Sequence, residues 1–306
     1  MKYLCYLNHY LDHLDAEDDP MTTTHEVIAP ADLVSETRRN HQSTLDALRR
    51  VSIRNAQRWR RISDYNVPVP GLEWTAAETA AHMIGDLRDY TEVLTRYAKG
   101  YVTHPQQPAE SPSRMSAAVN ARHLTTVPDR NLHRLAAQLE QAAADYVAVA
   151  ETIATGTSVL TPNGLVIDPS TMTGLLLGEQ LIHGLDIARA AERDWTIGAD
   201  EALMAIPAVL TVAPDYLRPS QANQRVSFEL RMRGGARYRF AVVNGTALVS
   251  EAGAPVDCTI TADPVAFLLV GFGRVPQWSA VLRGKLRVGG RRPWRAAKFG
   301  ALLSNP

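Results

Sequence analysis

Glu179, His183 and Asp186 are side chains that could bind a metal ion or move a proton, and they stand close together in the sequence. Their separations of four, three and seven positions place them on one face of a helix, because an α-helix turns once every 3.6 residues. The segment around them is largely apolar, so we expect the helix to be buried. A buried carboxylate without a partner is costly, and a divalent cation would be a suitable partner.

The helix that carries these side chains has a clear start. Asp168 is a good N-cap residue, and Pro169 suits the first helical position, where a missing N–H costs nothing. Apolar residues then surround most of the helix, which favours burial on more than one side. The sequence therefore predicts a buried helix over residues 168–193.

A second helix supplies a further candidate ligand, His82. Thr75 and Glu78 have the spacing of a capping box, and the helix that follows should end near Gly100. Small residues share a face with His82, which would let the two helices approach closely: Ala77, Ala81 and Gly85. If these helices are neighbours, His82 meets Glu179 and His183.

Two histidines and one carboxylate with a fourth position open form the ligand set of a catalytic zinc site. Nickel, manganese and iron accept the same ligands, so the set restricts the metal without identifying it. Two simpler interpretations stay open. His82 could be a hydrogen-bonded core histidine, and Glu179 with His183 could be an ordinary helical pair.

The composition and the hydrophobic pattern of the sequence divide the chain into three parts. Residues 1–29 read as a disordered or weakly structured extension, in which Met21 is an alternative start. Residues 30–197 contain four long helical patterns, with connections at 101–127 and 156–168, and predict a four-helix bundle. Residues 198–306 alternate apolar and polar residues with period two between short helices, which predicts an α+β domain with an antiparallel sheet.

Composition excludes several classes of protein. Lys and Arg together number 32, as do Asp and Glu, so the formal net charge is zero and a general nucleic-acid binder is not expected. Apolar runs are shorter than a membrane span, so we expect no membrane partner. The two cysteines, Cys5 and Cys258, form no disulfide framework, and a reducing cytoplasm fits best.

Two motifs resemble the mycothiol-dependent maleylpyruvate isomerase family, part of the wider DinB-like metalloenzyme superfamily. They are P-x-P-G-x-x-W-T-x-x-E-x-x-x-H, which ends at His82, and E-x-x-x-H-G-x-D, which runs from Glu179 to Asp186. The resemblance covers residues 32 to 195 and implies a DinB-like four-helix bundle. It also implies that His82, Glu179 and His183 are the metal ligands and that Asp186 acts in catalysis beside the metal.

The C-terminal part resembles a sterol-carrier-protein-like domain. The stretch TADPVAFLLVGFGRVPQWSAVLRGKLRVGG carries this likeness. In the isomerases an arginine of the second domain reaches the active site, and Arg274 is our candidate for it. Other arginines lie in the same domain. Arg274 could instead be a solvated residue at the end of a helix, with no role in the active site.

The resemblance implies a chemistry for this site. A divalent metal, with zinc as the first candidate, would convert the thiol of mycothiol into a thiolate at neutral pH. The thiolate would attack a small electrophile, giving either a cis-trans isomerase or an S-transferase. Asp186 could manage a proton, and Arg274 could hold a substrate carboxylate by a two-pronged contact. Monomer and homodimer both stay open.

Two alternatives belong to other classes. The chain could be a carrier that binds an apolar ligand in its C-terminal domain, with the bundle as a scaffold. This idea rests on the apolar face of the sheet and on analogy of fold, which says little about function. The chain could also be a member of the family that has lost its chemistry.

Overall fold

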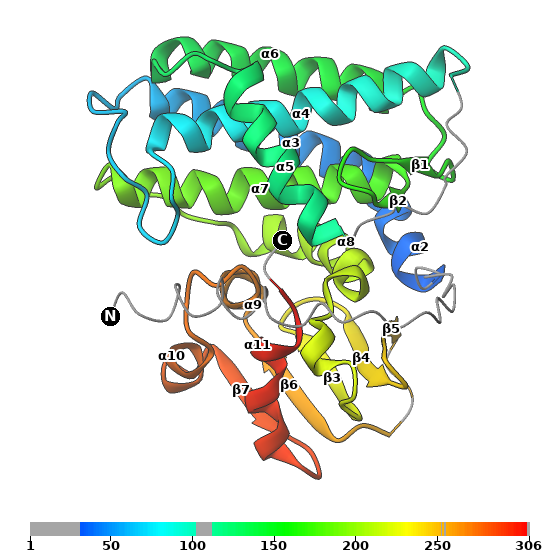
Figure 1. The fold of residues 1–306 in the computed structure, drawn as a ribbon. Coiled ribbons are helices and arrows are strands. Elements are labelled where there is room, and N and C mark those ends of the chain that lie inside the picture. The colour runs from blue at the N-terminus through cyan, green and yellow to red at the C-terminus, as the bar shows by residue number, and fades with distance from the viewer. Residues whose placement is uncertain (1–30, 102–111, 252, 254, 305–306) are drawn as a thin grey trace, which may run out of the picture.

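The computed structural model describes residues 31–101, 112–251, 253 and 255–304, and Figure 1 shows their arrangement. The expectation for residues 1–29 lies outside these ranges. Within them, helices occupy one half of the molecule, and a sheet with short helices occupies the other. The fold class of a helical part followed by a sheet with helices is therefore confirmed. No helix among the described residues is long and apolar enough to cross a membrane.

Four long helices form a bundle, as the periodicity predicted. They are α3 (His41–Trp59), α4 (Ala76–Ala98), α6 (Leu132–Ala150) and α7 (Pro169–Ala190). Helix α3 contacts α6 and α7, and α4 contacts the same two, so α3, α6, α4 and α7 follow one another around the bundle (Figure 1). The helices that carry His82 and Glu179 are neighbours.

Two connections of the bundle contain regular structure that the sequence analysis did not predict. Residues 101–127 were expected to be a long connection with one helical turn, but helix α5 (Pro112–Thr126) lies there and packs on α4. The connection at 156–168 contains a short hairpin of β1 (Val159–Leu160) and β2 (Val166–Ile167). At the start of the bundle, α2 (Ala31–Arg39) is separated from α3 by a turn at Asn40.

The second half of the molecule contains a five-stranded sheet. Its strands are β3 (Val226–Met232), β4 (Arg237–Val243), β5 (Thr246–Glu251), β6 (Cys258–Ala262) and β7 (Leu286–Gly289), in the order β5-β4-β3-β6-β7. The prediction of an antiparallel sheet is wrong at one pairing, because β3 and β6 run parallel. The hairpins β3-β4 and β4-β5 place β5 at one edge, and the chain then returns to pair β6 with the free side of β3.

Short helices accompany the sheet. They are α8 (Ala199–Val212), α9 (Pro264–Gly271), α10 (Gln277–Leu282), α11 (Phe299–Leu302) and the 3-10 turns η1 (Ala213–Tyr216), η2 (Pro219–Gln221) and η3 (Pro293–Lys298). On the apolar face of the sheet, Phe228 and Phe240 both contact the ring of Phe299 edge-on. Protein side chains therefore fill this part of the face.

Helix α7 belongs to both halves of the molecule. Leu176 packs in the core of the bundle, whereas Leu177 and Leu181 pack in the core that includes the sheet. A Cβ at Gly174 would overlap Ala208 of α8, so a glycine there lets the two helices approach closely. With both sides covered, α7 is buried as predicted.

Candidate metal centre

The two helices that carry the candidate ligands begin at the caps that the sequence predicted. At the start of α4, the Glu78 backbone N–H donates to Thr75 Oγ1 and the Thr75 N–H donates to Glu78 Oε2. At the start of α7, Asp168 Oδ1 accepts from the backbone N–H of Thr171. These caps fix the helical register and therefore the direction in which His82 and Glu179 project.

His82, Glu179 and His183 converge between α4 and α7. Glu179 Oε2 lies 3.1 Å from His183 Nε2 and 3.7 Å from His82 Nε2, and the ligand atoms of all three lie within 4.8 Å of one another. Ligands about 2.1 Å from one tetrahedral zinc are about 3.4 Å apart, so this spacing fits a single cation. The donor set of two imidazoles and a carboxylate also suits zinc and its neighbours in the first transition row.

Asp86 also faces this point and was missed in the sequence analysis. It stands four residues after His82 on α4, and its Oδ2 lies 3.2 Å from His82 Nε2. Asp86, His82 and His123 form a second cluster whose donor atoms lie within 4.8 Å of one another. The i,i+4 spacing of His82 and Asp86 was a readable signal, because it places both side chains on one helical face.

The outer nitrogen of His183 is held by a carboxylate. Its Nδ1 lies 3.0 Å from Asp186 Oδ2, and the guanidinium of Arg274 donates to the same carboxylate. Arg274 Nη1 also donates to the carbonyl oxygen of Phe272. The structure thus brings together Asp186 and Arg274, which the sequence analysis had placed near the metal, but with Asp186 behind His183.

The outer nitrogen of His82 is held by a second histidine. His82 Nδ1 lies 3.1 Å from His123 Nδ1, and His123 Nε2 lies 2.9 Å from Asp89 Oδ2. His123 was not predicted as a site residue, because the segment around it was expected to be a connection. The prediction that Gly85 faces α7 is wrong. A Cβ at Gly85 would overlap the ring of His123, so Gly85 makes room for that ring.

Burial and neighbouring charges act against each other in this cluster. Burial raises the pKa of Asp86 above its ordinary value, although the nearby imidazoles oppose this. For Glu179, burial also acts to raise the pKa, but hydrogen bonds from His183 and His82 outweigh it and hold the pKa below its usual range. Two partly buried carboxylates therefore meet where added positive charge would be favourable.

Aromatic side chains surround the cluster. Trp74, from the first sequence motif, lies with its ring centre 5.0 Å from that of His82. Tyr90 and Tyr216 are buried, and their pKa values are raised by burial and then by the charges of nearby carboxylates, among them Asp86 and Glu179.

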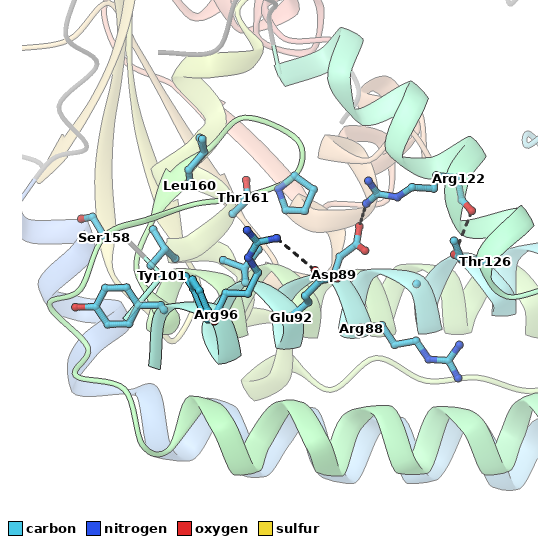
Figure 2. Close-up of a pocket in the computed structure, with 15 residues that line it drawn as sticks. Arg88, Asp89, Glu92, Arg96, Tyr101, Arg122, Thr126, Ser158, Leu160 and Thr161 are labelled. Atoms are coloured by element: carbon cyan, nitrogen blue, oxygen red, sulfur yellow. Dashed lines mark hydrogen bonds and ion pairs between the residues drawn. The ribbon is translucent and has the colours of Figure 1, made fainter. Parts of the chain in front are cut away.

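A cavity of about 620 Å³ lies beside α4 and α5, on the side of α4 that carries Asp89. Gly85 and Asp89 line it from α4, and Arg122 lines it from α5. Figure 2 shows the guanidinium of Arg122 directed at the carboxylate of Asp89, with which it forms an ion pair. The carboxylate that holds His123 therefore stands in the wall of this cavity.

Comparison with known proteins finds a family match within the helical part. Residues 62–188 match the family model described as the mycothiol maleylpyruvate isomerase N-terminal domain. No curated protein matches the sequence.

Three solved structures are also similar. One is a crystal structure of the mycothiol-dependent maleylpyruvate isomerase, with 14% identity, 77% of this chain and 90% of that chain covered, and a TM-score of 0.48. A point mutant of that isomerase gives 13% identity, 81% and 92% coverage, and a TM-score of 0.49. Sterol carrier protein 2 from Yarrowia lipolytica in the apo form gives 23% identity, 22% and 63% coverage, and a TM-score of 0.19.

Proposed function

Residues 62–188 carry a mycothiol maleylpyruvate isomerase N-terminal domain, and on this premise we propose that the protein is a metal-dependent enzyme that uses mycothiol. Its substrate is a small electrophile that bears a carboxylate, and the reaction is a cis-trans isomerisation of the maleylpyruvate type or an S-transfer. The observation that carries the proposal is the convergence of His82, Glu179 and His183 on one point.

In this proposal His82, Glu179 and His183 hold a divalent cation, with zinc as the first candidate. When bound, such a cation lowers the pKa of a coordinating thiol until it is deprotonated at neutral pH. Asp86 faces the same point and adds negative charge that favours a cation over a neutral ligand. The ring of Trp74 packs against that of His82 on one side of the centre.

Asp186 and Arg274 keep a place in the proposal, with roles set by their contacts. Because Asp186 accepts from His183 Nδ1, it fixes the ring so that Nε2 faces Glu179. Arg274 donates to Asp186 from Nε and Nη2. A substrate carboxylate would therefore share this guanidinium with Asp186.

Replacement of His183 tests the metal and the activity together. We expect purified protein to contain about one zinc per chain, and His183→Ala to lose both the metal and the consumption of a maleylpyruvate-type electrophile. His133→Ala is a matched control, because His133 is exposed on α6. Full activity in metal-free protein, or in His183→Ala, would rule the proposal out.

The fate of the thiol separates the two reactions. An isomerase regenerates mycothiol, so the free thiol measured with a chromogenic disulfide stays constant while the substrate isomerises. An S-transferase that adds the thiol to the electrophile consumes one thiol for each electrophile. The mass of the product is then the mass of the electrophile plus that of mycothiol.

A further inference from the structure

His123 is buried on α5 and stands between His82 and Asp89. Its exposed fraction is 0%, so it is in contact with protein atoms and not with solvent. Its Nδ1 lies 3.1 Å from His82 Nδ1, and its Nε2 lies 2.9 Å from Asp89 Oδ2. Gly85, on the turn between His82 and Asp89, leaves the space that the ring occupies.

When a cation is bound at His82 Nε2, the contact between the two rings allows one arrangement of protons, although Asp86 Oδ1 also lies 3.7 Å from His123 Nδ1. His82 Nε2 faces Glu179 and Asp86, so this nitrogen must be unprotonated when it binds a cation, and the ring proton then lies on Nδ1. This N–H can only donate to His123 Nδ1 if that nitrogen is an acceptor. The proton of His123 then lies on Nε2, from which it donates to the carboxylate of Asp89.

We propose that His123, oriented by Asp89, is a positioning residue that fixes the ring orientation and the tautomer of His82 for metal binding. This inference rests on the proposed role of His82 as a ligand. In this arrangement a carboxylate orients each ligand histidine. His183 donates directly to Asp186, whereas His82 donates to His123, which in turn donates to Asp89. Such outer partners raise metal affinity because the ligand ring is held in its binding orientation before the metal arrives.

Two substitutions of His123 separate the acceptor from the rest of the ring. His123→Asn keeps an oxygen near the position of Nδ1, whereas His123→Gln keeps a donor near the position of Nε2 and removes the acceptor. Zinc affinity of metal-stripped protein, measured by competition with a chromophoric chelator, should fall by about 10- to 100-fold in His123→Gln. In His123→Asn it should stay within about threefold of the natural protein, because His82 Nδ1 keeps its acceptor.

Asp89→Asn tests the other end of the chain. Its amide can donate to His123 Nε2, which would move the proton of His123 to Nδ1 and set it against the proton of His82. We expect a loss of affinity like that of His123→Gln. His133→Ala is the control and should bind zinc normally. The visible spectrum of the cobalt(II) form should shift in the variants that lose affinity, because the orientation of the His82 ring changes.

Each outcome is decisive for the positioning role. Natural affinity in His123→Gln, or an equal loss in the Asn and Gln variants, would overturn it. A merely structural role would lower the thermal midpoint of the metal-free protein and leave zinc affinity unchanged, so both are measured. The proposed function can fail separately. A protein that binds zinc as described and never consumes an electrophile with mycothiol would keep the positioning role.

Discussion

Arg274 donates to the carboxylate of Asp186 from Nε at 3.2 Å and from Nη2 at 2.7 Å, although the two residues lie 88 positions apart in the sequence. Asp186 belongs to α7 of the bundle, and Arg274 follows α9 beside the sheet. The side chain of Asp186 is 3% exposed and that of Arg274 is 17% exposed. This contact therefore ties the sheet to the helix that carries two of the proposed ligands.

Replacement of Arg274 by alanine should destabilise the protein strongly. The substitution removes one of the two partners of the buried Asp186 carboxylate, and breaking a buried ion pair typically costs about 3 kcal/mol of unfolding free energy. Urea unfolding of the metal-free protein measures this loss. As a control, Arg96→Ala should change the free energy of unfolding by less than about 0.5 kcal/mol, since its pair with Glu92 is exposed. Equal effects of the two substitutions would contradict the importance of the buried pair.

Local rules allowed much of this structure to be predicted from the sequence. The caps at Thr75 and Asp168 and the common face of Glu179, His183 and Asp186 follow from helical geometry alone, which depends on residues within a few positions. The alternation of apolar residues likewise located β3 and β4. These features depend little on the rest of the chain.

The features that were missed depend on contacts between distant segments. His123 became part of the site only because α5 packs against α4, and the segment that forms α5 starts within a polar, proline-rich stretch. The sequence shows that Gly85 leaves space beside its helix, but it does not show which neighbour fills that space. The parallel pairing of β3 and β6 is also set by the path of the chain between them.

At two buried glycines in long helices, substitution by alanine should change the stability of the protein in opposite directions. Gly85→Ala would push its new methyl group into the ring of His123, and we expect a loss of about 1–3 kcal/mol from overpacking. Gly178→Ala would meet Ala205 at an ordinary contact distance of 3.9 Å, so better helix propensity should raise stability by up to about 1 kcal/mol. Thermal or urea unfolding gives both signs. A stabilising Gly85→Ala would show that the ring of His123 can move aside freely.

Asp215 should make stability fall as the pH rises through a defined window. Burial raises its pKa to about 6 from the model-compound value of 3.8. Between these values the folded protein holds a proton that the unfolded chain has released, so the free energy of unfolding decreases with rising pH and levels off above pH 6. The total effect is on the order of 3 kcal/mol.

Asp215→Asn removes the titrating group and tests this sign. The variant should exceed the natural protein in stability at pH 7.5, and the difference should disappear below about pH 3, where Asp215 is protonated in both states. Urea unfolding at several pH values measures it. Asp145→Asn, at an exposed position, should show no such trend. A difference that grows toward low pH would mean that Asp215 is stabilised as an anion.

Removal of the proposed metal should weaken the whole bundle, because the ligands come from both α4 and α7. A ligand that binds only the folded state stabilises it by about 4 kcal/mol when its free concentration is 1,000 times its dissociation constant. Chelation with EDTA should therefore lower the thermal midpoint of the natural protein, and added zinc should restore it. The His183→Ala variant should be insensitive to both treatments. In metal-free protein Asp86→Asn should raise stability at neutral pH, since the Asp86 carboxylate is destabilised first by burial and also by the nearby charge of Glu179. If EDTA leaves the midpoint unchanged in protein that contains zinc, the ion lies elsewhere and the assignment of its ligands is wrong.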